Sequence, residues 1–229
     1  EVEELGLEAA DVAHGHLVEE AVGAGPDGDD LALDRELWRW VPDDVSLHIT
    51  RMPYAPLAAT MEMALHISDP TLVARGVTDV AAVSPLVTAY ACTSGSFIGG
   101  LSGETALVSA MIRASAPAAV TTSGALLAAL RHLDVPRIAT VTPYTADLTA
   151  ALSSYLAEAG VEVVATAGLG LISDIWTVPY DVTAGLVRDT DTAQAQAVFI
   201  SCTNLPTYDA IAPLEAELCK PVLTANQVT

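Results

Sequence analysis

Leu86-Val-Thr-Ala-Tyr-Ala-Cys92 is an apolar run of strand length that leads straight into the polar turn Thr93-Ser-Gly-Ser96. A helix is predicted over 104–114, after this turn. A strand, a tight turn and a helix in this order are typical of one β-α-β unit. Ligands of such units bind at the carboxyl ends of the strands, which is where Cys92 lies.

The same unit recurs along the chain. Further strands are predicted at 45–51, 118–122, 137–142, 161–165, 198–202 and 221–225. Helices are predicted at 33–40 and 61–75, and in segments that end at 133, 159, 191 and 218, the last opening at 203–206. Strands that alternate with helices of this length indicate parallel sheets with right-handed crossovers. Residues 1–30 fit no element, and 22–26 is a poor strand because of its glycines and proline.

A weak internal repeat relates Tyr90-Ala-Cys92-Thr-Ser to Ile200-Ser-Cys202-Thr-Asn, about half a chain apart. The repeat predicts an α/β fold of two similar lobes related by a pseudo-two-fold axis. Each lobe would be a parallel, four-stranded type of sheet in a three-layer αβα arrangement, with the active site between the lobes. We expect an unassigned segment at 1–30, a first lobe at 31–120 that the closing strand in 221–229 could complete, and a second lobe at 121–229.

Composition narrows the class of partner. Acidic residues number 29 against 9 basic ones, giving a net charge of −20. This charge argues against nucleic acid, whose phosphates need clustered Lys and Arg. The chain has no apolar run long enough to span a membrane and begins with acidic residues, unlike a signal peptide. Three cysteines in no regular pattern indicate free thiols in a reducing compartment, so we expect a cytoplasmic protein.

Cys92 and Cys202 carry the chemistry that the sequence predicts. A thiol at the end of a strand and just before a helix meets oriented N–H groups that favour the reactive thiolate. The turns that follow could hold a carboxylate with backbone N–H groups and short polar side chains, without any Arg. For Cys219 we expect only a buried structural role. The predicted carboxylate-binding side chains after the two cysteines are Thr93, Ser94, Thr203 and Asn204.

Three motifs together resemble a known family: Ala91-Cys-Thr-Ser-Gly-Ser96, Val141-Thr-Pro-Tyr144 and Ser201-Cys-Thr-Asn-Leu-Pro206. They are similar to the aspartate/glutamate racemase superfamily, and most of all to its maleate cis-trans isomerase and arylmalonate decarboxylase branch, over residues 31–229. The resemblance implies an isomerase that needs no cofactor and acts beside a carboxylate. Cys92 would add to the double bond of maleate, Cys202 would assist, and Tyr144 would bind substrate. Relatives also suggest a homodimer or larger assembly, and they continue into a last helix after 225–229.

Two departures from the family pattern weaken maleate as the substrate. Asp30 falls where maleate isomerases have an Asn, and Asp174 lies near their second substrate-binding Asn. A carboxylate at either place would repel a dicarboxylate but suit an amine or amide. Asp30 is then either a helper of Cys92 or a residue that begins a helix.

Several alternatives stay open at this point. One is a racemase of an amino acid or hydantoin-type compound, or an ectoine-utilisation protein. A decarboxylase is another, although decarboxylases of the branch keep only the second cysteine. A carboxylate-binding protein without activity is the third. His14-Gly-His16 has no partner cluster for a metal and is interpreted as part of a solvated helical face, so no metal is predicted.

Overall fold

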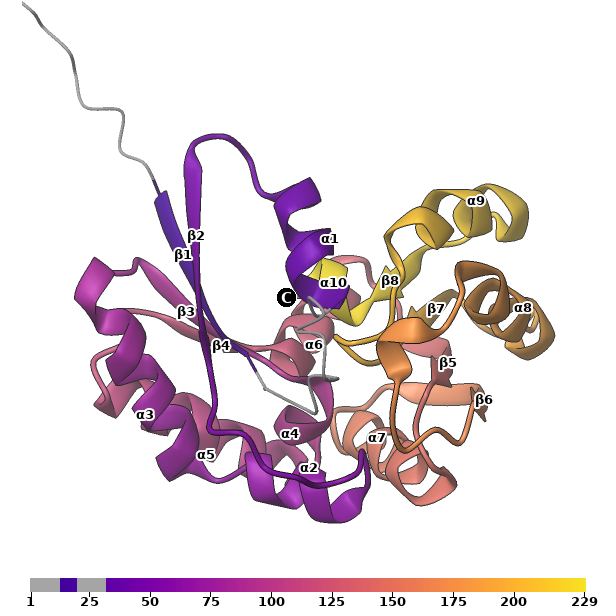
Figure 1. The fold of residues 1–229 in the computed structure, drawn as a ribbon. Coiled ribbons are helices and arrows are strands. Elements are labelled where there is room, and N and C mark those ends of the chain that lie inside the picture. Colours follow the sequence, from indigo (N-terminus) through magenta and orange to yellow (C-terminus); the bar gives the residue numbers. More distant parts are fainter. Residues whose placement is uncertain (1–12, 20–31) are drawn as a thin grey trace, which may run out of the picture.

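The computed structural model describes residues 13–19, as backbone only, and residues 32–229. Within these ranges two four-stranded parallel sheets have the same strand order (Figure 1). The first is β2-β1-β3-β4, with β2 Val45–Arg51, β1 Ala13–Glu19, β3 Val87–Ala91 and β4 Ala119–Thr121. The second is β6-β5-β7-β8, with β6 Glu162–Gly168, β5 Arg137–Thr142, β7 Ala197–Ile200 and β8 Val222–Thr224.

Helices flank both sheets, as Figure 1 shows. Helices α3 and α5 pack along the first sheet, α7, α8 and α9 pack along the second, and α4 and α5 contact α7 across the lobes. The described helices are α1 Ala32–Trp40, α2 Met61–Ile67, α3 Pro70–Val80, η1 Ala81–Val83, α4 Thr93–Phe97, α5 Gly100–Arg113, α6 Thr122–His132, α7 Ala146–Glu158, η2 Ile175–Thr177, α8 Tyr180–Thr190, α9 Tyr208–Leu218 and α10 Ala225–Val228.

The inner strands β3, β5 and β7 are almost entirely buried. Every residue of β7 is buried, and Tyr90 of β3 is fully buried. Continuous apolar runs of this kind are what a parallel sheet between helix layers requires. One hydrophobic core contains buried residues of both lobes, among them Cys92 and Cys202. The predicted α/β fold with parallel sheets and flanking helices is therefore confirmed.

Three local predictions were wrong. The predicted helix 61–75 is two helices, because Pro70 has no N–H to continue the first and Asp69 caps the second by accepting from the Thr71 amide at 2.8 Å. The segment that holds His14 and His16 is strand β1 between β2 and β3, not a helical face, because its backbone pairs on both sides. The helix that ends at 218 was predicted to open at 203–206, but α9 starts at Tyr208, after a turn over 203–207.

The closing strand β8 pairs with β7 and so extends the second sheet rather than the first. The first sheet obtains its inner strand β1 from residues before 31 instead. Helix α10, which follows β8, returns to pack against α6 and α1. The final residues of the chain therefore contact elements next to the first sheet without pairing with it.

Gly95 sits in a very close contact at the end of β3. A Cβ atom built there would lie 2.2 Å from the hydroxyl oxygen of Tyr90. That hydroxyl is fixed, because Tyr90 is fully buried and donates to the Ile67 carbonyl at 2.8 Å. The turn after Cys92 can approach β3 this closely only with glycine at position 95.

We expect Gly95→Ala to lower the free energy of unfolding by about 1–3 kcal/mol, the usual cost of overpacking. Gly103→Ala is the matched control, because a Cβ at Gly103 in α5 would meet nothing within 4 Å. That control should be neutral or raise stability by up to about 1 kcal/mol. Urea unfolding of both variants tests this, and equal stability of the two would contradict the close contact.

Candidate active site

The two predicted cysteines lie at equivalent ends of the two sheets. Cys92 directly follows β3, and Cys202 follows β7, which holds the same place in the second sheet. Both are nearly buried, with exposed fractions of 2% and 8%. The Thr203 hydroxyl donates to the Ala91 carbonyl at 3.4 Å and so joins the two turns across the lobes. The structure thus brings together the segments that the repeat pointed to.

The turn after Cys92 is built to hold negative charge. Cys92 is the N-cap of α4, and its Sγ accepts from the Gly95 amide at 3.4 Å. The Ser94 hydroxyl lies 3.7 Å from the same sulfur. Donors placed at a sulfur stabilise the thiolate over the thiol. The buried Thr93 hydroxyl has no hydrogen-bond partner among the described residues, so it can bind a ligand atom.

A buried serine pair that the sequence analysis missed holds this turn. Ser96 Oγ lies 2.9 Å from the Thr93 carbonyl oxygen and 2.7 Å from Ser123 Oγ. The Ser123 amide donates back to Ser96 Oγ at 3.2 Å. Ser123 lies in the first turn of α6, directly after the neighbouring strand β4. Its position at a strand end was the one signal in the sequence that could have marked it.

The Cys202 turn differs in its backbone. Cys202 has φ 89°, a left-handed conformation that is rare for residues with a side chain. The Leu205 amide closes the turn by donating to the Cys202 carbonyl at 3.2 Å. Asn204 is partly engaged elsewhere, because its Oδ1 accepts from the Ala32 amide at the start of α1 at 3.4 Å. The second turn is therefore anchored to α1, whereas the first is anchored to α6.

Tyr144 connects the two cysteines. It follows β5, is buried, and its hydroxyl accepts from Ser201 Oγ at 3.4 Å. Burial raises the pKa of Tyr144 well above its ordinary value, and negative charge on Cys202 and Cys92 raises this pKa further. The phenol therefore keeps its proton and can donate it in a hydrogen bond. Ser201 is a third residue, after Ser96 and Ser123, that the sequence analysis did not single out.

Two predicted residues, Asp30 and Asp174, are not joined to this centre by a hydrogen bond between described residues. Asp30 falls outside the described residues. Asp174 is exposed, has φ 54°, and accepts from the neighbouring Ser173 hydroxyl at 2.7 Å. In the described part of the chain no hydrogen bond joins it to either cysteine, so its role stays a prediction. Cys219 is exposed and ends α9 in a left-handed conformation, so the expected buried role was wrong.

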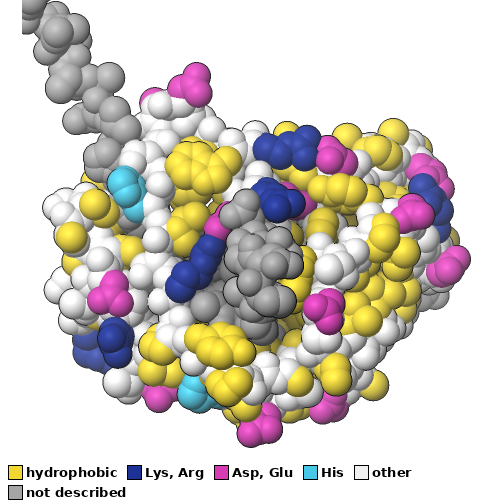
Figure 2. All heavy atoms as spheres, viewed as in Figure 1, with side chains coloured by type: hydrophobic (Ala, Val, Ile, Leu, Met, Phe, Trp, Pro, Cys, Tyr) yellow, Lys and Arg dark blue, Asp and Glu magenta, His cyan; other side chains and the backbone are white. Residues whose placement is uncertain are grey.

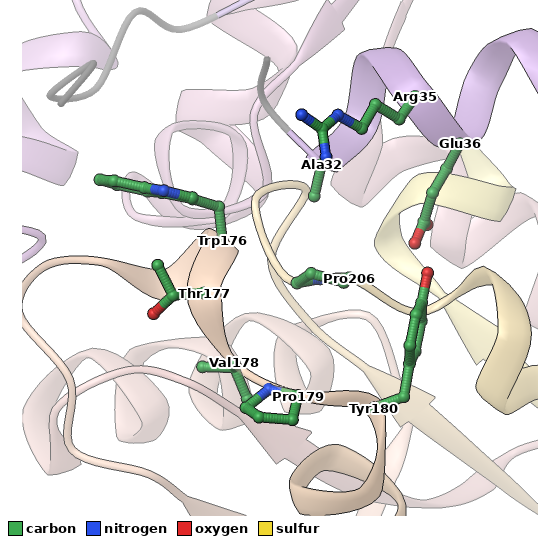
Figure 3. A pocket seen from close by; sticks show the side chains of 9 residues that line it. All are labelled: Ala32, Arg35, Glu36, Trp176, Thr177, Val178, Pro179, Tyr180 and Pro206. Carbon is green, nitrogen blue, oxygen red and sulfur yellow. The ribbon is translucent and has the colours of Figure 1, made fainter. Parts of the chain in front are cut away.

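A cavity of about 450 Å³ adjoins the Cys202 turn (Figure 3). Its walls come from α1, from η2 with the segment after it, and from Pro206 in the Cys202 turn. In Figure 3, the Tyr180 hydroxyl points toward the Glu36 carboxylate. The lining is apolar apart from a few polar groups, as in many small-molecule sites. It consists of Ala32, Arg35, Glu36, Trp176, Thr177, Val178, Pro179, Tyr180 and Pro206.

Among the side chains of residues 32–229, no group of three or more His, Cys, Asp or Glu could hold a metal ion. None of the helices described there is long and apolar enough to cross a membrane.

The raised pKa of Tyr144 gives a stability prediction. The folded state holds the phenol proton more tightly than the unfolded state, whose pKa is near 10.0. The associated stability is complete below that pH and is lost as the pH rises toward the folded pKa. Relative to Tyr144→Phe, wild type should therefore lose up to about 1.4 kcal/mol of unfolding free energy per pH unit above pH 10. Urea unfolding in neutral and alkaline buffers measures it, and a difference that does not change with pH would contradict it.

Comparison with known proteins identifies relatives of two kinds. A maleate isomerase of Nocardia farcinica is 30% identical over 159 residues, which are 66% of this chain and 63% of that protein. The arylmalonate decarboxylase of Bordetella bronchiseptica is 34% identical over 139 residues, 58% of each chain. A maleate isomerase of Pseudomonas putida is 33% identical over 113 residues, 48% of this chain and 45% of the relative. These matches thus span about half to two thirds of the relatives' length.

Solved structures show the same fold. The Nocardia farcinica maleate cis-trans isomerase bound to TRIS superposes with a TM-score of 0.81 at 24% identity, covering 95% of this chain and 89% of the other. A liganded double variant of arylmalonate decarboxylase gives 0.79 at 24% identity, covering 94% and 88%. The resemblance inferred from the cysteine motifs is confirmed. The family model for arylmalonate decarboxylase matches residues 70–228, more than half of the chain, and the protein therefore belongs to this family.

Proposed function

We propose that the protein is a cofactor-independent isomerase of a small carboxylic acid, with Cys92 as the nucleophile and Cys202 as the acid/base partner. The observation that carries the proposal is the buried Tyr144 hydroxyl, which accepts from Ser201, the neighbour of Cys202, at 3.4 Å. Burial and the charges of Cys202 and Cys92 raise the pKa of this hydroxyl. A protonated phenol beside two thiols offers a carboxylate one donor within reach of both reactive groups. The maleate isomerases among its relatives support the choice of reaction.

A cis-unsaturated dicarboxylate would react by addition, rotation and elimination. The Cys92 thiolate forms a bond to one carbon of the double bond, and the π electrons move onto the neighbouring carbon and its carboxylate. The Cys202 thiol protonates that carbon, which leaves a saturated thioether with a central single bond. After rotation about this bond, the Cys202 thiolate removes the proton. The C–S bond then breaks and releases the trans acid and the Cys92 thiolate.

Two further observations support this sequence. A variant of the Nocardia farcinica maleate cis-trans isomerase in which serine replaces a cysteine holds a covalently bound succinylcysteine intermediate. In the present protein the Thr93 hydroxyl has no partner in the described part of the chain and follows Cys92 directly. With Tyr144, this hydroxyl would stabilise the negative charge that develops on the carboxylate during the addition.

The family model favours a second candidate, a decarboxylase. Two cysteines on opposite lobes also suit a racemase, in which one thiolate removes a proton and the other thiol returns one from the opposite face. If Asp30 and Asp174 reach the substrate, an amine- or amide-bearing acid becomes the better ligand. We further propose a cytoplasmic location, which the three free thiols support. Assembly as a homodimer or larger oligomer stays a prediction from the resemblance.

We expect Cys92→Ala and Cys202→Ala each to reduce turnover by at least about 10³-fold, because each removes a group that bonds to the substrate or moves its proton. Cys219→Ala is the matched control, since Cys219 is exposed. It should keep wild-type turnover. The assay is a panel of maleate, arylmalonates, aspartate, glutamate and hydantoins followed by NMR. Full activity of Cys92→Ala on the preferred substrate would refute the assignment.

Solvent exchange separates the reaction classes. In D₂O a racemase must incorporate deuterium at the α-carbon with every inversion, and a decarboxylase must place it on the carbon that loses CO₂. In the isomerase scheme Cys202 delivers a deuteron from solvent and then removes the same deuteron, so the trans product keeps its original hydrogens. Trans product with little deuterium therefore supports the isomerase, and complete deuteration of a saturated product excludes it.

A further inference from the structure

Glu36 is a buried carboxylate away from the reacting thiols, with an exposed fraction of 3%. Its two oxygens accept from three amide or hydroxyl donors of the second lobe, at 2.5 to 2.8 Å, and from the side-chain amide of Asn226 at 2.6 Å. The first three donors are Thr207 N, Thr207 Oγ1 and Tyr208 N. A carboxylate so deeply buried is tolerated because every oxygen faces donors.

Three of these four donors belong to the beginning of α9. Thr207 is the N-cap of this helix, but its own side chain makes no capping hydrogen bond. Glu36 supplies the missing acceptor from α1, and its negative charge lies at the positive end of the α9 dipole. Helix α9 follows the Cys202 turn, so the carboxylate fixes the end of that turn.

Asn226 extends the contact to the cysteine itself. Its Nδ2 donates to Glu36 and also to the Leu205 carbonyl at 3.2 Å. The Leu205 amide in turn donates to the Cys202 carbonyl at 3.2 Å. A continuous series of hydrogen bonds thus runs from α1, through α10, to the backbone of Cys202.

Cys202 needs such support. Its φ of 89° is a conformation that residues with a Cβ rarely adopt, and it persists only where the surrounding structure fixes it. The turn is held at its end by Glu36 and in its middle by Asn226. Glu36 also lines the cavity beside this turn, so the support lies at the edge of the space open to a ligand (Figure 3).

We propose that Glu36 is a positioning residue for Cys202: together with Asn226 it holds the 202–207 turn in the strained conformation that aims the second thiol at the substrate. The inference rests on the proposed acid/base function of Cys202. Glu36 makes no contact with the reacting atoms in this proposal. It acts through the backbone of the turn.

The test is the rate at which iodoacetamide alkylates each cysteine, measured separately by peptide mass spectrometry. Glu36→Gln keeps the shape but turns one acceptor oxygen into an N–H donor that faces other donors. Local opening of the turn should then raise the alkylation rate of Cys202 by at least about fivefold, while that of Cys92 changes by less than about twofold. On the preferred substrate, kcat should fall by at least about tenfold with KM nearly unchanged.

Two more variants complete the design. Asn226→Ala removes the link to Leu205 but leaves the α9 cap, and it should alter the Cys202 rate in the same direction; it carries the test if Glu36→Gln fails to fold. Asp209→Asn is the matched control, because Asp209 pairs with Arg39 at 2.7 Å between the same helices α1 and α9 but at the surface. It should leave both thiol rates and kcat at wild-type values.

The outcomes separate this inference from the proposed function. A Cys202 rate that stays at the wild-type value in Glu36→Gln, or in Asn226→Ala if the first variant does not fold, overturns the positioning role. Equal increases at Cys92 and Cys202 also overturn it, because they indicate general destabilisation. A selective change at Cys202 in a protein that turns over no acid of the panel supports the positioning role and refutes the isomerase.

Discussion

Parallel strands of one sheet all end on the same side, and here the ends of two sheets meet. The constraint is geometric. In a parallel sheet the last carbonyl and amide groups of every strand lie at the same end of the sheet, where each strand must turn into a helix. The residues of the candidate site follow from it. Cys92 comes after β3, Tyr144 after β5 and Cys202 after β7. The Thr203 to Ala91 hydrogen bond shows that these ends are in contact.

The electrostatic character of the site follows from the same arrangement. With a net charge of −20, the protein repels an acidic substrate at long range. On the face in Figure 2, the Asp and Glu side chains are spread over the surface rather than gathered in one patch. Among the described residues around Cys92 and Tyr144, the polar groups are neutral donors, namely a backbone amide, hydroxyls and a phenol. Such donors select for shape and hydrogen bonding rather than for charge alone.

The sequence was sufficient to predict the central strands and the cysteine pair, because apolar runs that end in polar turns report burial and direction together. It failed for β1, because the residues around His14 and His16 do not form the apolar run that is typical of an inner strand. Pairing with β2 and β3 determines the conformation of this segment. Glu36 was also beyond prediction. Nothing in its helical neighbours indicates that donors from 171 to 190 positions later converge on it. Contacts of that range depend on tertiary structure alone.

The two turns are topologically equivalent, but they are not conformational copies. Cys92 has an extended backbone with φ −139°, whereas Cys202 has φ 89°. Glycine at position 202 would remove the backbone strain, so the cysteine side chain is present there at a cost in strain. A duplicated scaffold thus presents two thiols with different backbone constraints. Folding stability and the proposed reactivity are in opposition at Cys202, and selection for stability alone would remove the thiol that the proposed chemistry requires.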